Sequence, residues 1–256
     1  MGKFIFTNGG GLSVASGPST TSKANSNLTG FLDAPDQIYG SGADGSVTLD
    51  GTATILSMVP SGSVYTATRD LFFYNLTLSD SVRLNPAGYR IFVQNILMLG
   101  NGSVIGHTTG FSTAGSIQQG GAATVAVTHS LGGSSATQTA TVPTALTGGT
   151  NYYYQPFQAV RGYSITGSST TPTFLRGGAG GASGTGGGVV ILAARYISLS
   201  SGTATIKAPG TTGAGGGGGG VVIIISSAAT LLSGVSTDVT AGTGGTAGTS
   251  IYSQVA

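Results

Sequence analysis

A run of aromatic residues is the part of this sequence best suited to binding. Tyr152, Tyr153 and Tyr154 are consecutive, and Phe157 follows close behind. Exposed aromatic side chains offer a large, rigid contact area at a small cost in conformational entropy, and they are frequent at recognition surfaces. Tyrosine rings also stack on sugars. We therefore interpret these four residues as candidate ligand or interface contacts. The alternative is that alternate tyrosines pack into a small core of their own.

Aspartates are the only residues that could form a catalytic carboxylate pair, because the chain contains no glutamate. The nearest pairs in the sequence are Asp33 with Asp36 and Asp44 with Asp50. Two carboxyl groups can cleave a glycosidic bond when one donates a proton and the other is ionised. Asp33 and Asp36, however, stand in a sequence typical of turns that aspartate caps, and Asp44 stands at the start of a hairpin or turn. We predict that the protein is not an enzyme and has no catalytic residues, with a glycan-cleaving aspartate pair as the alternative.

Ligands for a metal or for a phosphate-bearing cofactor are equally scarce. The two histidines, His107 and His129, lie far apart in the sequence, and the chain has no cysteine, so their spacing does not indicate zinc. The glycine-rich segments lack the Gly-Lys-Ser/Thr ending and the following helix of a phosphate-binding loop. We predict no metal and no cofactor, and we expect each histidine to be a surface or interface side chain.

The composition restricts the folds that could carry these residues. Of the 256 residues 47 are glycine, only 6% are charged and 39% are hydrophobic, and the net charge is +2. Helical bundles need abundant Glu, Lys and Leu, disulfide scaffolds need cysteine, and nucleic-acid-binding proteins need a dense basic face. The longest apolar runs, Val189–Ala194 and Val221–Ile225, are too short to span a membrane. The composition therefore favours an all-β structural protein without a nucleic-acid or membrane partner.

Two internal repeats predict how the strands are arranged. Gly188–Ala193 matches Gly220–Ile225 at an offset of 32 residues, and a second repeat has an offset of 20. Short β runs that recur between polar corners are typical of stacked coils, which bury one continuous core. We predict an all-β, short parallel β-helix-like (solenoid) stack without helices, in which the β-branched triplets are buried on both faces. The second repeat aligns Leu71 with Ile91, Phe72 with Phe92 and Leu76 with Ile96, and the coils are expected to begin near Leu71, Ile91, Val189 and Val221.

The chain divides into four segments by composition. The first is an extended N-terminal arm, which is either a loose tail or a segment that becomes ordered against a neighbouring subunit. A β-rich insertion that contains the tyrosine cluster separates two sets of coils. Glycine runs such as Gly215–Gly220 directly precede apolar strands, so we expect packed glycine turns rather than free linkers. The predicted boundaries are 1–45 for the arm, 46–106 for the first β-coils, 107–176 for the insertion and 177–256 for the Gly-rich repeated β-coils.

The first coils contain a distinctive pattern of aromatic and polar residues. Thr68–Leu78 carries Arg-Asp, aromatic residues and Asn-Leu-Thr, and Leu84–Val93 carries Asn-Pro-Ala-Gly-Tyr-Arg-Ile-Phe-Val. Together with the polyglycine and apolar run of Gly215–Ile225, this pattern resembles glycine-rich β-repeat proteins of tailed bacteriophages. The resemblance covers about residues 40–104 and 177–241. It implies a virion structural protein without catalytic residues. The first expectation is a capsid decoration or cement protein on the head, and the alternative is a tail fibre or spike that binds a host surface glycan through the tyrosine-rich insertion.

The resemblance also implies partners and a location. The major capsid protein or other virion proteins would bind the chain, and the virion would hold it after synthesis in the host cytoplasm. Met1–Phe4 lacks the pattern of a signal peptide, in agreement with cytoplasmic synthesis. Stacked coils expose sheet edges that three-fold packing can cover, so we expect a homo-oligomer and prefer a trimer.

Overall fold

The computed structural model describes residues 38–107, 126–128, 130–141, 176–213 and 215–255, and every regular element within these ranges is a β strand. The prediction of an all-β protein is therefore confirmed for this part of the chain. Most of the predicted arm (1–45) and most of the predicted insertion (107–176) lie outside the described residues.

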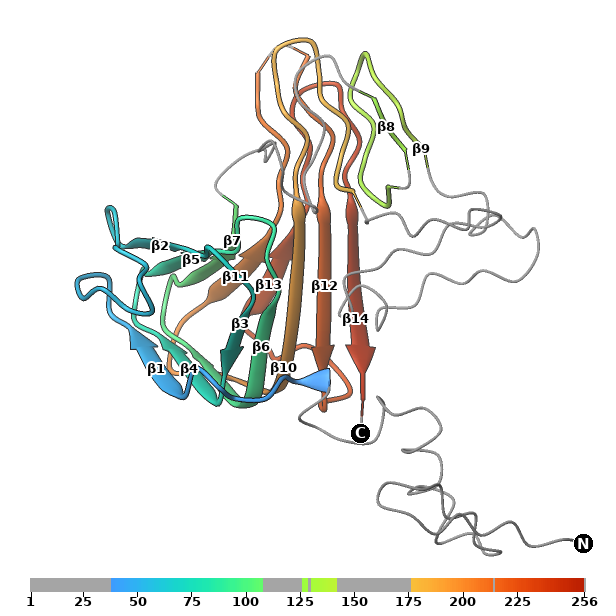
Figure 1. Ribbon diagram of the computed structural model, residues 1–256. Coiled ribbons are helices and arrows are strands. Elements are labelled where there is room, and N and C mark those ends of the chain that lie inside the picture. The colour runs from blue at the N-terminus through green and yellow to red at the C-terminus, as the bar shows by residue number, and fades with distance from the viewer. Residues whose placement is uncertain (1–37, 108–125, 129, 142–175, 214, 256) are drawn as a thin grey trace, which may run out of the picture.

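A large parallel sheet spans the breadth of the molecule, from β1 to β14 (Figure 1). Its strand order is β1-β4-β6-β10-β12-β14, and β3 pairs with β6 next to β4. Every pairing between these strands is parallel. The strands are β1 (Ser46–Leu49), β3 (Leu71–Phe73), β4 (Asn75–Leu78), β6 (Ile91–Leu99), β10 (Val189–Leu199), β12 (Val221–Ser226) and β14 (Thr249–Gln254).

A second parallel sheet packs against the first, with strand order β13-β11-β7-β5-β2. In both sheets the spatial order of the strands follows their order in the chain, because the chain passes from one sheet to the other and back in each repeat. A separate short pair, β8 (Val127–Thr128) and β9 (Ala140–Thr141), is also parallel. The second sheet consists of β2 (Val64–Thr66), β5 (Arg83–Asn85), β7 (Val104–Gly106), β11 (Ala204–Lys207) and β13 (Val235–Asp238).

The register of the large sheet matches the predicted repeats at two of its pairings, β10 with β12 and β3 with β6. Val189 pairs with Val221, which is the predicted offset of 32. Phe72 pairs with Phe92, which is the predicted offset of 20. Equivalent side chains of successive repeats therefore lie side by side on neighbouring strands.

The predicted alignment of Leu76 with Ile96 is wrong, because Leu76 pairs with Leu97. The sheet bends between β3 and β4, and β6 runs through this bend with one residue more than its neighbours. The offset is thus 20 before the bend, where Phe73 pairs with Val93, and 21 after it. An extra residue of this kind bends a strand and disturbs the local pairing.

Both faces of the large sheet are buried along β12 and along the first six residues of β10, Val189–Ala194. Val222 faces the second sheet and belongs to the main core, whereas its neighbour Ile223 belongs to a second core on the opposite face. Phe92 also lies in the second core, together with Ile38 and Tyr39 from the last residues of the predicted arm. The prediction that the apolar runs are buried on both faces is confirmed, because all six residues of β12 are buried.

The glycine-rich segments form a packed bundle at one end of the molecule, which we call the apex (Figure 1). It contains residues 177–188, 208–213, 215–220 and 239–248. Within Gly215–Gly220 every third N–H is donated to the same neighbouring segment, the period of an extended helix with three residues per turn. The expectation of packed glycines rather than free linkers is confirmed. The donors and acceptors are Gly216 to Thr243 and Gly219 to Thr246 on one side, and Gly217 to Thr211 and Gly220 to Ala208 on the other.

Candidate functional site

The predicted ligand contacts Tyr152, Tyr153, Tyr154 and Phe157 lie outside the described residues, as does His129. The aspartate pair Asp33 and Asp36 lies outside them too. The described part of the chain therefore contains Asp44, Asp50 and His107 from the predicted candidates. It also contains a cluster that the sequence alone did not single out.

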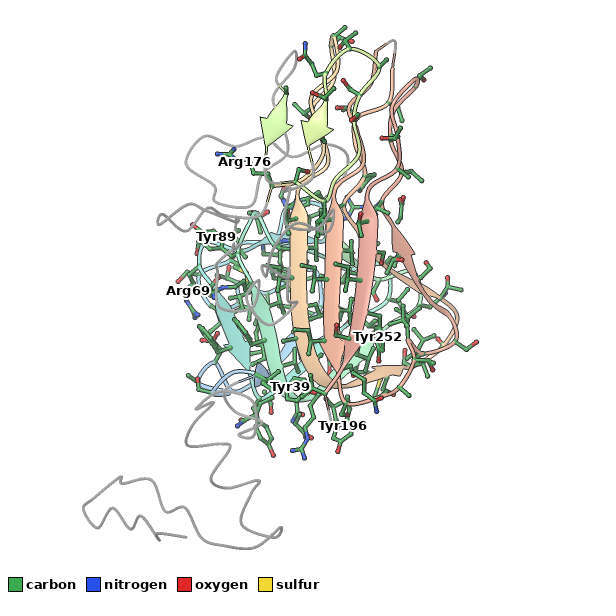
Figure 2. The ribbon with its side chains drawn as sticks, turned by 90° about the vertical axis from the view of Figure 1, so that its right-hand side faces the viewer. Tyr39, Arg69, Tyr89, Arg176, Tyr196 and Tyr252 are labelled. Carbon is green, nitrogen blue, oxygen red and sulfur yellow. The ribbon has the colours of Figure 1, made fainter. Side chains whose placement is uncertain are left out.

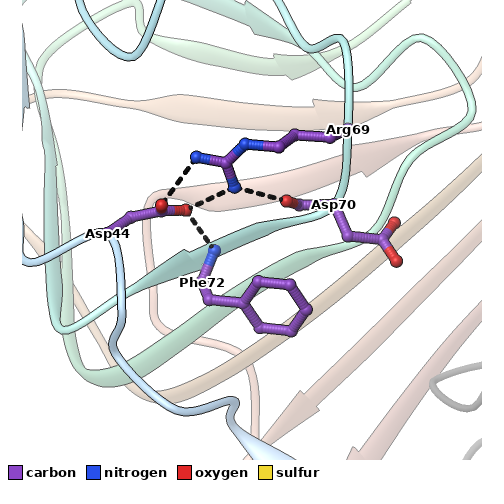
Figure 3. A network of polar contacts seen from close by, with 4 residues as sticks. All are labelled: Asp44, Arg69, Asp70 and Phe72. Atoms are coloured by element: carbon purple, nitrogen blue, oxygen red, sulfur yellow. Dashed lines mark hydrogen bonds and ion pairs between the residues drawn. The ribbon is translucent and has the colours of Figure 1, made fainter.

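Asp44, which lies just before β1, is held by Arg69, which lies just before β3 (Figure 3). The two guanidinium nitrogens of Arg69 donate to the two carboxylate oxygens of Asp44, at 3.0 and 2.6 Å. The backbone N–H of Phe72 donates to the same carboxylate at 2.7 Å. Burial by itself would raise the pKa of Asp44, but the bonds from Arg69 and Phe72 hold it below its usual value. These contacts fix the turn that precedes β1. Within this turn the Gly45 N–H also donates to the Gly42 carbonyl.

We expect Asp44→Ala to destabilise the protein more than Arg69→Ala does. Asp44 accepts a backbone N–H that would otherwise lose its partner, so its removal should cost about 2 kcal/mol. Arg69 is half exposed, so its ion pair is screened by solvent and its removal should cost about 1 kcal/mol or less. Urea unfolding of the two variants measures both values. Equal losses would show that the ion pair, and not the bond to Phe72, carries the stability of this corner.

Asp50 caps a turn and does not form a pair with Asp44. Its carboxylate accepts the N–H groups of Thr52 and Ala53 at 2.8 and 2.9 Å. The hydroxyl of Tyr65 donates to the same oxygen at 3.1 Å. The N–H groups of Ala53 and Thr52 are the main reason that the pKa of Asp50 falls to about 2. The interpretation of Asp44 as a turn residue is confirmed, and the carboxylates of Asp44 and Asp50 are each occupied by their own structural bonds.

His107 lies in the interior, contrary to the expectation of a surface or interface side chain. It follows β7 directly, only 1% of its surface is exposed, and its Nδ1 lies 3.2 Å from Oδ1 of Asn85. Its backbone N–H donates to the carbonyl of Lys207, which continues the second sheet by one residue. Burial lowers the pKa of His107 to about 4, because a charged imidazole would lose its hydration there. The side chain is therefore neutral at pH 7.

We expect acid to destabilise the protein through His107. Its pKa is about 4 in the folded chain and 6.5 when unperturbed, so the unfolded chain binds the proton first as pH falls. The stabilisation is complete above pH 6.5 and is lost progressively toward pH 4, for a total of roughly 3 kcal/mol. Urea unfolding of the native protein and of His107→Gln at pH 7.5 and 4.5 measures this loss. If both proteins lose the same free energy over this interval, His107 is not the group responsible.

A cluster of tyrosines and one arginine lies at the end of the molecule opposite the apex, which we call the base (Figure 2). Tyr39 donates its hydroxyl to the Val255 carbonyl at 2.9 Å, which joins the first and last described parts of the chain. The guanidinium of Arg195 lies 5.4 Å from the centre of the Tyr196 ring. The charge of Arg195 lowers the pKa of Tyr39, but burial outweighs it and raises this pKa to about 12. Tyr39 is therefore a structural donor, whereas Tyr196 remains 47% exposed.

The sequence carried a signal for this cluster. Arg195 and Tyr196 interrupt the apolar run that begins at Val189, at a point where a buried strand would continue with apolar residues. The arrangement offers an exposed ring, a cation and hydroxyl groups, which suits binding rather than bond cleavage.

Within the described ranges, no group of three or more His or Asp side chains could hold a metal ion. No helix among the described residues is long and apolar enough to cross a membrane. Comparisons with protein-family models, with curated proteins and with solved structures gave no match.

Proposed function

We propose that this protein is a non-enzymatic structural protein on the surface of a bacteriophage particle, built as a short parallel β-helix-like stack. The observation that carries the proposal is the agreement between chain order and strand order in two parallel sheets. A stack of this kind gives a rigid body from short repeats, because each coil contacts mainly its neighbours. Its core needs no disulfide, since the chain has no cysteine.

Side-chain ladders along the stack support this reading. Asn75 donates to Ser46 of the preceding coil at 3.0 Å, and Asn95 of the following coil donates to Asn75 at 2.9 Å. Such contacts between equivalent positions of successive coils satisfy polar groups at a corner without any charged residue. They suit a structural element that must keep its shape outside a cell.

The two ends of the molecule differ, and this favours attachment through one of them. The glycine bundle forms the apex, whereas the described chain begins at Ile38 and ends at Val255 near the base (Figure 1). We propose that the base faces the particle and the apex faces outward. A decoration or cement protein bound to the major capsid protein, as a trimer, is the first candidate. A mass near three times 24.9 kDa in analytical ultracentrifugation is the expected result for the trimer, and a monomer would contradict it.

A tail fibre or spike is the second candidate. The apex projects beyond the sheets (Figure 1), as expected for the tip of a protein that binds a host cell. In this case the tyrosine-rich insertion would bind a host surface glycan. Replacement of Tyr152, Tyr153 and Tyr154 by alanine should then abolish adsorption to cells. The same replacement should leave adsorption unchanged for a head decoration protein.

Immunogold labelling of intact particles from the source culture tests the proposal. Gold over the heads is the result expected for a decoration protein, and gold confined to tail tips would favour the fibre. Particles that lack the gene serve as the control for antibody specificity. Unlabelled native particles would overturn the proposed function in both forms.

A further inference from the structure

An uncharged surface lies at the base, on the outer side of the large sheet beyond its bend. It carries the outward-facing residues of β4, β6 and β10, and we call it the base face. Their orientation follows from their neighbours, since the alternate residues Leu76, Leu97 and Ile197 belong to or pack on the main core. Its six residues are Asn75, Thr77, Ile96, Met98, Tyr196 and Ser198.

The apolar part of the base face is concentrated in neighbouring strands. Ile96 and Tyr196 are register partners, so their side chains stand side by side across two strands. Ile96 is 38% exposed and Tyr196 is 47% exposed. Two of the exposed large hydrophobic residues in the described ranges therefore stand next to each other on this face. Exposed apolar groups that cluster in this way mark interaction sites, whereas scattered ones need no explanation.

The composition of the base face is that of a protein–protein contact. The centres of such contacts are enriched in Tyr, Met and Arg and depleted in Lys, Glu and Asp. The base face contains Tyr196 and Met98, Arg195 lies over the Tyr196 ring at its edge, and none of the six positions is charged. A charged partner surface would lose its hydration against this face without compensation.

The backbone beneath the base face is already fixed in the free protein. β6 pairs with β10 from Ile96 to Leu99, and with β4 from Leu97 to Leu99. The Asn75 and Asn95 amides hold the bend, because Asn75 Oδ1 also accepts the N–H of Ile96 at 3.2 Å. A surface that is rigid before binding loses little conformational entropy when a partner covers it.

We propose that the base face is the docking surface of this protein for another virion protein, whose contact area is uncharged and apolar at its centre. This inference rests on the proposed function and names the part of the molecule that attaches. A protein is favoured over a glycan because the six residues stand on the outer side of a sheet, whereas small ligands are bound in concave sites. The position of the face agrees with this role, since Tyr39 and Tyr196 both lie at the base (Figure 2).

Incorporation of variants into particles tests the docking surface. Particles that lack the gene are produced in cells that supply the native protein, Tyr196→Asp or Tyr89→Asp, and the protein in purified particles is quantified by immunoblot. Tyr89 is the matched control, because it is a tyrosine of similar exposure (37%) that lies away from the base (Figure 2). A carboxylate at the centre of the contact should reduce incorporation of Tyr196→Asp by about tenfold or more. Tyr89→Asp should be incorporated like the native protein.

The outcomes separate the inference from the function on which it rests. If the native protein is absent from particles, the proposed function is overturned. If the native protein and Tyr196→Asp are incorporated equally, the function stands and the docking surface is wrong. Equal incorporation together with a loss of adsorption to cells would show that the base face binds a host ligand instead. Thermal unfolding of each purified variant ensures that a misfolded protein is not counted as a docking defect, and Ile96→Asp provides an independent second variant.

Discussion

Replacement of Gly218 by alanine should disrupt the apex, with a loss of about 3 kcal/mol or more in the free energy of unfolding. A methyl group at this position would lie well inside van der Waals contact of the Gly133 carbonyl oxygen. The obstacle is backbone, so no side chain can rotate away to make room. Gly218 is also bonded on two sides, because its N–H donates to Ala179 at 2.8 Å and its carbonyl accepts from Gly187 at 2.9 Å. A shift that relieves the contact with Gly133 would therefore break these bonds.

Gly45→Ala is the control for this prediction. Gly45 has a positive φ of 71° and no atom within 4 Å of the position that a methyl group would take. Its replacement tests backbone strain alone, which should cost about 1–2 kcal/mol. Urea unfolding compares the two variants, and hydrogen exchange locates the loss of protection at the apex. If Gly218→Ala costs no more than Gly45→Ala, close packing of the glycine segments is not what stabilises the apex.

Replacement of Phe73 by alanine should destabilise the protein by about 3–5 kcal/mol. Phe73 is completely buried in the main core, where its removal would leave a cavity between two sheets whose backbones are held in register. Phe72, the preceding residue, points to the opposite face of β3 and is only partly buried. Its ring stacks on that of Phe92 with the centres 4.9 Å apart.

Phe72→Ala is the matched control, because it removes the same side chain from the next position in the chain. It should cost about half as much as Phe73→Ala, since its ring keeps part of its contact with water and leaves no enclosed cavity. Thermal and urea unfolding of both variants provide the comparison. A larger loss for Phe72→Ala would mean that the inward and outward faces of β3 are assigned the wrong way round.

Much of the fold was predictable because the repeats consist of apolar residues, which must be buried. The match between Val189 and Val221 predicted a register that the large sheet adopts, since equal apolar residues stack on equal neighbours. The bend could not be predicted in this way. Whether β6 has one residue more than β3 and β4 depends on how three strands curve together. The predicted partner of Leu76 is therefore wrong by one residue.

The partners in the ion pairs could not be predicted from the sequence either. Arg69 and Asp70 are adjacent in the sequence, yet their side chains pair with Asp44 and Arg90 of other coils. These partners lie 25 and 20 residues away in the chain. Neither partner is a neighbour in the sequence, and only the pairing of the strands in space brings these charges together.

The sequence by itself determined that the described part of this protein is all-β, that glycine and not charge dominates the composition, and that the strands repeat. These properties follow from residue types, because β-branched runs must be buried and polyglycine has no side chains to pack. The tertiary structure alone decided that His107 is interior, that residue 39 meets residue 255, and that Ile96 and Tyr196 stand together on an open face. Each of these depends on which strands are neighbours in space, and a single chain does not encode this in any short stretch of its residues.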